Sequence, residues 1–137
     1  MRIMGLDIGT KNIGVAVSDE TGTIAQARGV VKRENEKKAI SRIKGIAEEY
    51  KVEEVVVGLP LNMNGTRGER AQDSEKFAKL LEKELKLPVK LWDERLSTKE
   101  AEDIMIMADI SRKKRRKDLD KLAAQIILQN YLDSLKK

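Results

Sequence analysis

The sequence has 137 residues and carries 28 Lys and Arg against 23 Asp and Glu, a formal net charge of +5. It contains no His and no Cys, which excludes disulfides, thiolate nucleophiles, His-based catalytic triads and ordinary zinc sites. The length fits one domain with its own core, and any metal must be held by oxygen atoms, with Mg²⁺ preferred over Mn²⁺.

The first part of the chain predicts a three-stranded antiparallel meander. Apolar runs rich in β-branched residues cover 2–8, 13–18 and 23–31, and turn-forming sequences separate them. Asp7 stands near the end of the first run, where burial of an ionised carboxylate without a partner is costly. We therefore expect Asp7 to face a cation.

Helices and strands then alternate along the chain. The remaining predicted elements are a helix from residue 34 or 35 to about 50, a strand over 52–58, a helix over 71–85, a strand over 89–92, a helix from the capping box at 97–100 to about 108, and a helix capped by Asp118 that ends near 135. The order βββαβαβα predicts an α/β fold in which helices flank a mixed five-stranded sheet, as a single domain over residues 1–137.

Four acidic residues stand at the ends of predicted elements. In an open α/β sheet the site forms outside the carboxyl ends of strands, so Asp7 meets Asp93 or Glu94 if their strands are near each other. Adjacent strand residues point to opposite faces, so one of Asp93 and Glu94 faces the metal, while Arg95 neutralises the other or contacts a phosphate. Asp120 lies on the core-facing stripe of the last helix, and the alternative is that it merely stabilises the helix N-terminus.

The positive charge is concentrated in one run before the last helix. Its candidate nucleic-acid contacts are Arg112, Lys113, Lys114, Arg115 and Arg116. If the run binds the phosphate backbone, affinity should fall steeply with salt, and the alternative is a solvated loop. The chain has one Trp, two Tyr and one Phe, which leaves little material for stacking on bases, and we expect Trp92 in the core.

Four ordered segments resemble the YqgF family. They are GLDIGTKNIGVAVSD, VVVGLPLNMNGT, LWDERLST and DLDKLAAQIILQNYL, and together they span nearly the whole chain. The resemblance implies an RNase H-like nuclease that acts in 5′-end processing of the small-subunit ribosomal RNA precursor, pre-16S rRNA. The same family is also associated with Holliday junction resolution, which we keep as the alternative function.

The resemblance also implies a set of site residues. Matched motif by motif, the acidic triad is Asp7, Glu94 and Asp120, which would hold one or two Mg²⁺ (or Mn²⁺) ions for phosphodiester hydrolysis. The acids would act as metal ligands rather than as general bases.

Substrate contacts follow from the same match. The residues Asn62, Asn64, Gly65 and Thr66 would form a substrate-facing loop. Lys11 and Arg95 are candidates to stabilise charge at the scissile phosphate, with Thr98 in support. Asn12 departs from the family, which often has a basic residue in that segment.

Interpretations from other classes remain open. DIGTKNIG also resembles the phosphate-binding hairpin of the actin and Hsp70 ATPase fold, as in a fragment of a sugar kinase, but that fold needs two such domains. A second alternative is a non-catalytic RNA-binding factor of ribosome assembly, and the presence of all three acids argues against this interpretation. The partner would be a structured RNA precursor or branched DNA, bound by a monomer or a homodimer. With no apolar stretch long enough to span a membrane, we expect a cytoplasmic protein.

Overall fold

The computed structural model describes residues 1–96 and 116–136, and of residues 96 and 116–120 the backbone is described. The elements are β1 (Arg2–Ile8), β2 (Asn12–Ser18), β3 (Ala25–Lys32), α1 (Glu36–Glu49), β4 (Val52–Leu59), α2 (Glu69–Leu85), β5 (Val89–Asp93), a short 3₁₀ helix η1 (Glu94–Leu96) and α4 (Arg116–Ser134). The five predicted strands are confirmed, as are the helices before and after β4. The helix predicted from residue 97 lies outside the described residues.

The N-termini of α1 and α4 differ in how well the sequence locates them. The predicted start of the first helix near residue 34 or 35 is confirmed, and Asn35 is the cap of α1, because its Oδ1 accepts a hydrogen bond from the Lys38 backbone N–H at 3.2 Å. α4 begins at Arg116, so Asp118 stands within its first turn and not at the cap. Acidic residues are favoured both at the cap and in the first turn, and the sequence alone does not separate these positions.

The strands form one mixed sheet in the order β3-β2-β1-β4-β5. The meander of β1, β2 and β3 is antiparallel, whereas β1 pairs with β4, and β4 with β5, in parallel. Leu6 of β1 pairs with Val57, and Leu59 pairs with Asp93 of β5. The carboxyl ends of β1, β4 and β5 therefore meet at one edge of the sheet, with β4 in the middle.

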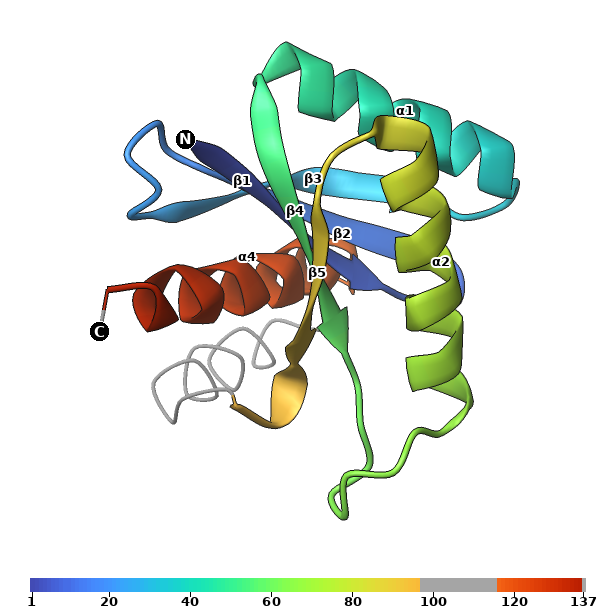
Figure 1. The fold of residues 1–137 in the computed structure, drawn as a ribbon. Helices are drawn as coiled ribbons and strands as arrows, with labels where there is room; N and C mark the ends of the chain where they lie inside the picture. Colours follow the sequence, from blue (N-terminus) through green and yellow to red (C-terminus); the bar gives the residue numbers. More distant parts are fainter. Residues whose placement is uncertain (97–115, 137) are drawn as a thin grey trace.

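Helices cover both faces of this sheet (Figure 1). The apolar side chains of α1 and α2 pack with Leu6 and Val57, and those of α4 pack with Ile3 and Val56. Successive strand residues point to opposite faces, so Asp7, which follows Leu6, lies on the α4 face. Among the described residues no helix combines the length and the apolar character needed to cross a membrane.

Glycines in β1 and β4 allow α4 to pack closely on the sheet. A Cβ atom built on Gly5 would lie 2.6 Å from Leu128 Cβ, and one on Gly58 would lie 2.5 Å from Ile127 Cδ1. Real side chains do not approach this closely, so the short distance between helix and strands depends on both glycines. The last helix is thus seated on a glycine-bearing patch of the two central strands.

The direction of α4 follows from two contacts at opposite ends of β4. Near the start of β4, the Tyr131 hydroxyl donates a hydrogen bond to Glu54 Oε1 at 3.1 Å. Near its end, Ile127 lies against Gly58. α4 therefore runs antiparallel to β4, and the backbone of residue 120, about 10 Å along the axis before Ile127, lies toward the edge where β1, β4 and β5 end.

Candidate active site

Asp7 is placed at that edge by the end of β1. It is half-buried and pairs with Gly14 across the first hairpin. The hairpin turns tightly, because the Gly9 backbone N–H donates to the Asn12 carbonyl at 2.9 Å, and a Cβ atom on Gly9 would lie 2.5 Å from the same oxygen. Asp7 therefore stands at the second-last position of β1, on the face covered by α4.

Glu94 reaches toward Asp7 across β4. It is the first residue of η1, directly after β5, and its carboxylate lies above Gly58 of the intervening strand. A Cβ atom on Gly58 would be 3.0 Å from Glu94 Oε2. Gly58 thus forms the floor on which the Glu94 carboxylate rests. Sequence reasoning missed this role, although a glycine at the end of a valine-rich strand is a known signal of close approach.

The electrostatics tie the two acids into one site. Burial of the Glu94 carboxyl is the main cause that raises its pKa to about 7, and the negative charge of Asp7 raises it further. The positive charge of Arg70 acts in the opposite direction. The carboxylates of Asp7 and Glu94 are therefore close enough to interact, and Arg70 lies within electrostatic range of Glu94.

Asp93 and Arg95 form a separate unit beside the pair. Arg95 Nη2 lies 2.8 Å from Asp93 Oδ2, and Arg95 Nε donates to Asp93 Oδ1 at 3.1 Å. The Asp93 pKa is lowered, first by the hydrogen bond from the Arg95 side chain. Arg95 Nη1 also donates to the Met63 carbonyl at 3.3 Å. Of the two contacts expected for Arg95, the structure displays the ion pair with an acid, and that acid is Asp93.

The predicted substrate-facing loop is held by its own side chains. Asn62 Nδ2 donates to Thr66 Oγ1 at 2.9 Å, and Thr66 Oγ1 donates to Asn64 Oδ1 at 2.7 Å. The Gly65 backbone, with a φ of 85°, donates to the Asn62 carbonyl at 2.8 Å. These polar groups are exposed, but their described hydrogen bonds shape the loop itself. The loop leaves β4 at the same edge as Asp7 and Glu94 (Figure 1).

The other predicted site residues divide by position. Lys11 is exposed in the turn between β1 and β2. The side chains of Asp120 and Arg116, together with Thr98 and the run over 112–115, lie outside the described residues. Within the described part of the chain, no group of three acidic side chains could hold a metal ion. Asp7 and Glu94 are the two members of the predicted triad that the structure brings together.

Trp92, which the sequence predicts in the core, is partly buried and packs against the core. It packs against the cluster formed with α4, and its ring meets the ring of Tyr131 edge to face, with centroids 5.8 Å apart. The ring is therefore committed to holding β5 on α4, which removes it as a platform for stacking on bases.

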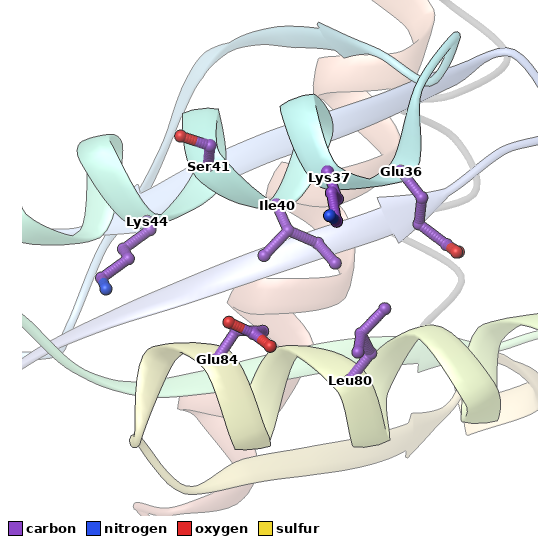
Figure 2. Close-up of a pocket in the computed structure, with 7 residues that line it drawn as sticks. All are labelled: Glu36, Lys37, Ile40, Ser41, Lys44, Leu80 and Glu84. Carbon is purple, nitrogen blue, oxygen red and sulfur yellow. The ribbon is translucent and has the colours of Figure 1, made fainter.

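A groove lies on the face of the sheet that is opposite to the acidic pair. It has a volume of about 570 Å³ and runs between α1 and α2, where side chains of both helices point into it (Figure 2). Ile40 and Leu80 give it an apolar floor, and the charged residues around it, such as Lys44 and Glu84, are of both signs. Because the sheet separates this groove from Asp7, it is no part of the acidic site.

Comparison with known sequences identifies relatives over the full length of the chain. A match to the family RuvX, described as Holliday junction resolvase, covers residues 1–134. A protein of Geobacillus sp. (strain WCH70) named "Putative pre-16S rRNA nuclease" is 56% identical over 136 residues, which make up 98% of this chain and 99% of that protein. A protein of the same name from Thermoanaerobacter pseudethanolicus is 56% identical over 137 residues, covering 99% of each.

Comparison with solved structures supports the fold. RuvC of T. thermophilus, solved in complex with a Holliday junction substrate, matches with a TM-score of 0.61 and 18% identity over 99% of this chain and 96% of that one. The fowlpox virus Holliday junction resolvase matches with a TM-score of 0.58 and 19% identity over 98% and 99% of the two chains. The predicted RNase H-like fold, shared with RuvC, is confirmed.

Proposed function

The chain belongs to the RuvX family, the YqgF family of the motifs above, and on this premise we propose that it is a metal-dependent nuclease in 5′-end processing of pre-16S rRNA. The observation that carries the proposal is the position of the Glu94 carboxylate above Gly58, within electrostatic range of Asp7. One carboxylate at the end of β1 and one directly after β5 converge there, at the edge where open α/β sheets place their sites.

The donor groups fit a hard divalent cation. Asp7 and Glu94 supply carboxylate oxygens only, which Mg²⁺ and Mn²⁺ prefer, and a cation between them would offset the repulsion of two half-buried negative charges. We include Asp120 as the third ligand, because the direction of α4 brings its backbone toward the same edge. Mg²⁺ held there would activate a water molecule and stabilise the negative charge that develops on the phosphate.

The chain's own residues position this chemistry. Gly58 leaves room for the Glu94 carboxylate, and the Arg95–Asp93 pair holds the end of β5 so that Glu94 is directed toward β1. In the proposed reaction, a water oxygen forms a bond to phosphorus while the bond to the leaving 3′ oxygen breaks, and the products are a 5′ phosphate and a 3′ hydroxyl. Lys11 and Arg70 add positive charge where the phosphate must approach two carboxylates.

Cleavage of a four-way DNA junction is the second candidate. The family description favours it directly, and the family match covers residues 1–134. A resolvase makes paired incisions, which a symmetric dimer would provide, whereas trimming of an RNA end needs one site. A non-catalytic assembly factor is the third candidate, and it would bind RNA without cutting it. We propose a cytoplasmic location, where precursor ribosomal RNA is processed.

One assay separates these candidates. Purified protein with Mg²⁺ is incubated in parallel with a pre-16S rRNA 5′ end and with a four-way DNA junction of matched length, and the cleavage products are mapped. We expect cleavage of the RNA that disappears in Asp7→Asn, while binding remains. Cleavage of the junction alone would favour the resolvase. Cleavage that persists in Asp7→Asn would contradict the acidic site, and binding without cleavage of either substrate would favour the assembly factor.

A further inference from the structure

A second hollow lies beside the acidic pair. Its volume is about 350 Å³, and it is lined by Gly9, Thr10, Lys11 and Asn12 of the turn between β1 and β2, and by Arg70 of α2. Among the residues whose side chains the structure describes, no acidic side chain contributes to this lining. The hollow, here called the turn pocket, is thus bordered by backbone, by two small polar side chains and by two cations.

Lys11 and Arg70, the two cations of the turn pocket, differ in their ion pairing from two arginines nearby. Arg33 is paired with Asp73, and Arg95 is paired with Asp93. Within residues 1–95 and 121–136, where side chains are described, neither Lys11 nor Arg70 has an ion-pair partner. Their positive charges are therefore available to an anionic ligand.

The walls of the turn pocket are fixed to each other by Arg33. Its guanidinium donates to both carboxylate oxygens of Asp73 in α2, at 2.6 and 2.7 Å, and to the Gly9 carbonyl at 3.1 Å. Its backbone N–H donates to the Lys11 carbonyl at 2.8 Å. The Arg33 side chain is 13% exposed, and its guanidinium lies 5.0 Å from the centroid of the Phe77 ring. One largely buried residue thus joins the turn to the helix that carries Arg70.

The turn pocket is next to the proposed catalytic acids. Gly9 follows Asp7 by two residues, which span about 7 Å of extended chain. Arg70, on the other wall, acts electrostatically on Glu94. A phosphate in the pocket would therefore be offset from the acidic pair by a distance of the same order as the spacing between neighbouring phosphates of one strand.

We propose that the turn pocket binds a backbone phosphate of the substrate strand next to the phosphate that is cut, with Arg70 and Lys11 as its charged contacts. The proposal rests on the proposed nuclease function and adds a subsite to it. Arg70 provides a planar fork of donors, and Lys11 a compact charge, a combination suited to a phosphodiester. Arg33 is a positioning residue, because it acts on the phosphate only by joining the two walls.

Binding measurements on Asp7→Asn, which should not cleave, test the subsite without relying on turnover. Affinity for the pre-16S rRNA 5′ end is measured as a function of salt in this background, alone and combined with Arg70→Gln. Because each neutralised phosphate contributes about one unit to the log–log slope, we expect Arg70→Gln to lower the slope by about one. Arg42→Gln, an exposed arginine of α1 outside the pocket, is the matched control and should leave the slope unchanged.

A chemical change in the substrate locates the phosphate. Neutral methylphosphonates replace single phosphates in a substrate carrying deoxyribose at those positions, one on each side of the mapped cut. In the Asp7→Asn background one flanking replacement should weaken binding about tenfold, and the same replacement should have little effect once Arg70 is Gln. Equal losses at every position in both proteins would mean a general field of positive charge and would overturn the subsite.

The positioning role of Arg33 is tested through its partner. Asp73→Asn removes a negative charge near the pocket, so electrostatics alone predicts tighter binding, whereas loosened walls predict loss of the effect of the flanking methylphosphonate. We expect the second result, and retention of the full effect would refute the positioning role. The two proposals fail separately. An unchanged salt slope in Arg70→Gln with intact cleavage by the natural sequence refutes only the subsite, whereas the expected slope change without any cleavage refutes only the nuclease.

Discussion

On the face covered by α1 and α2, the central strands present Leu6 and Val57, both fully buried. On the face covered by α4, the next residues along these strands are Asp7 and Gly58. Asp7 is one of the two acids of the candidate site, and Gly58 lies beneath the carboxylate of the other, Glu94. Near its carboxyl end each of these two strands thus places a core residue next to a residue of the candidate site. Residues that stabilise the fold and residues of the candidate site are therefore neighbours along the same strand. Substitution of the first should lower the free energy of unfolding, whereas substitution of the second should reduce cleavage.

The largest expected effects come from the adjacent residues Leu6 and Asp7. Leu6→Ala should lower the free energy of unfolding by about 2–5 kcal/mol, because it leaves a cavity in the α1/α2 face. Asp7→Asn should change stability little but reduce cleavage at least about 100-fold, because it removes a ligand oxygen charge. Denaturant unfolding and a cleavage assay with Mg²⁺ measure the two quantities. Loss of cleavage in Leu6→Ala while the protein remains folded would break the comparison.

Two glycines provide the next test. Gly58→Ala places a methyl group against Ile127 and Glu94, so we expect a loss of about 1–3 kcal/mol in unfolding free energy and reduced cleavage. Gly45 of α1 has open space at its Cβ position among the described residues, and Gly45→Ala should stabilise the protein by about 0.5–1 kcal/mol. Thermal melts and cleavage rates are compared for the pair. Full activity in Gly58→Ala would show that the Glu94 carboxylate does not depend on this floor.

A third test asks which face receives the nucleic acid. The basic run reaches Arg116, the first residue of α4, and changing Arg115 and Arg116 to Ala should reduce the salt dependence of binding by about two slope units. The control removes Lys37 and Lys44, which line the groove between α1 and α2, and should leave the slope unchanged. Binding is measured between low and moderate salt. An equal reduction in both double variants would indicate binding without preference for the α4 face.

The smallest expected effect is a pH dependence on the α2 side. Arg33 holds the pKa of Asp73 below its usual value, mainly through the hydrogen bond between their side chains. A lowered pKa in the folded state stabilises the fold above the unfolded pKa, and this contribution is lost as pH falls through the folded value. The Asp73 side chain is 41% exposed, so we expect Asp73→Asn to cost about 0.5–1 kcal/mol at neutral pH.

The stability that Asp73→Asn loses should also depend on pH. The difference in unfolding free energy between the natural sequence and Asp73→Asn should shrink below about pH 4, where the unfolded carboxyl becomes protonated. Urea unfolding at a series of pH values measures the difference. A constant difference across the series would show that the pair contributes through packing and not through charge.

Sequence patterns predicted the strands well because periodicity and turn residues act locally. The valine-rich β4 is an example, since its extended form depends on neighbours within a few residues. Which of Asp93 and Glu94 lies over β4 on the side of Asp7 was beyond such patterns. It depends on η1 turning at residue 94, which directs the Glu94 carboxylate over Gly58 while Arg95 holds Asp93.

By itself the sequence predicts a class of chemistry, because a chain without His or Cys would hold a catalytic metal through oxygen, and Asp7 stands where burial of a carboxylate favours a cation. The tertiary structure decided which groups meet. The strand order places β4 between β1 and β5, so Gly58 becomes the floor beneath Glu94. The packing of α2 on the sheet also brings Arg70 to the turn between β1 and β2. These meetings join residues far apart in sequence, and only packing across the sheet fixes them.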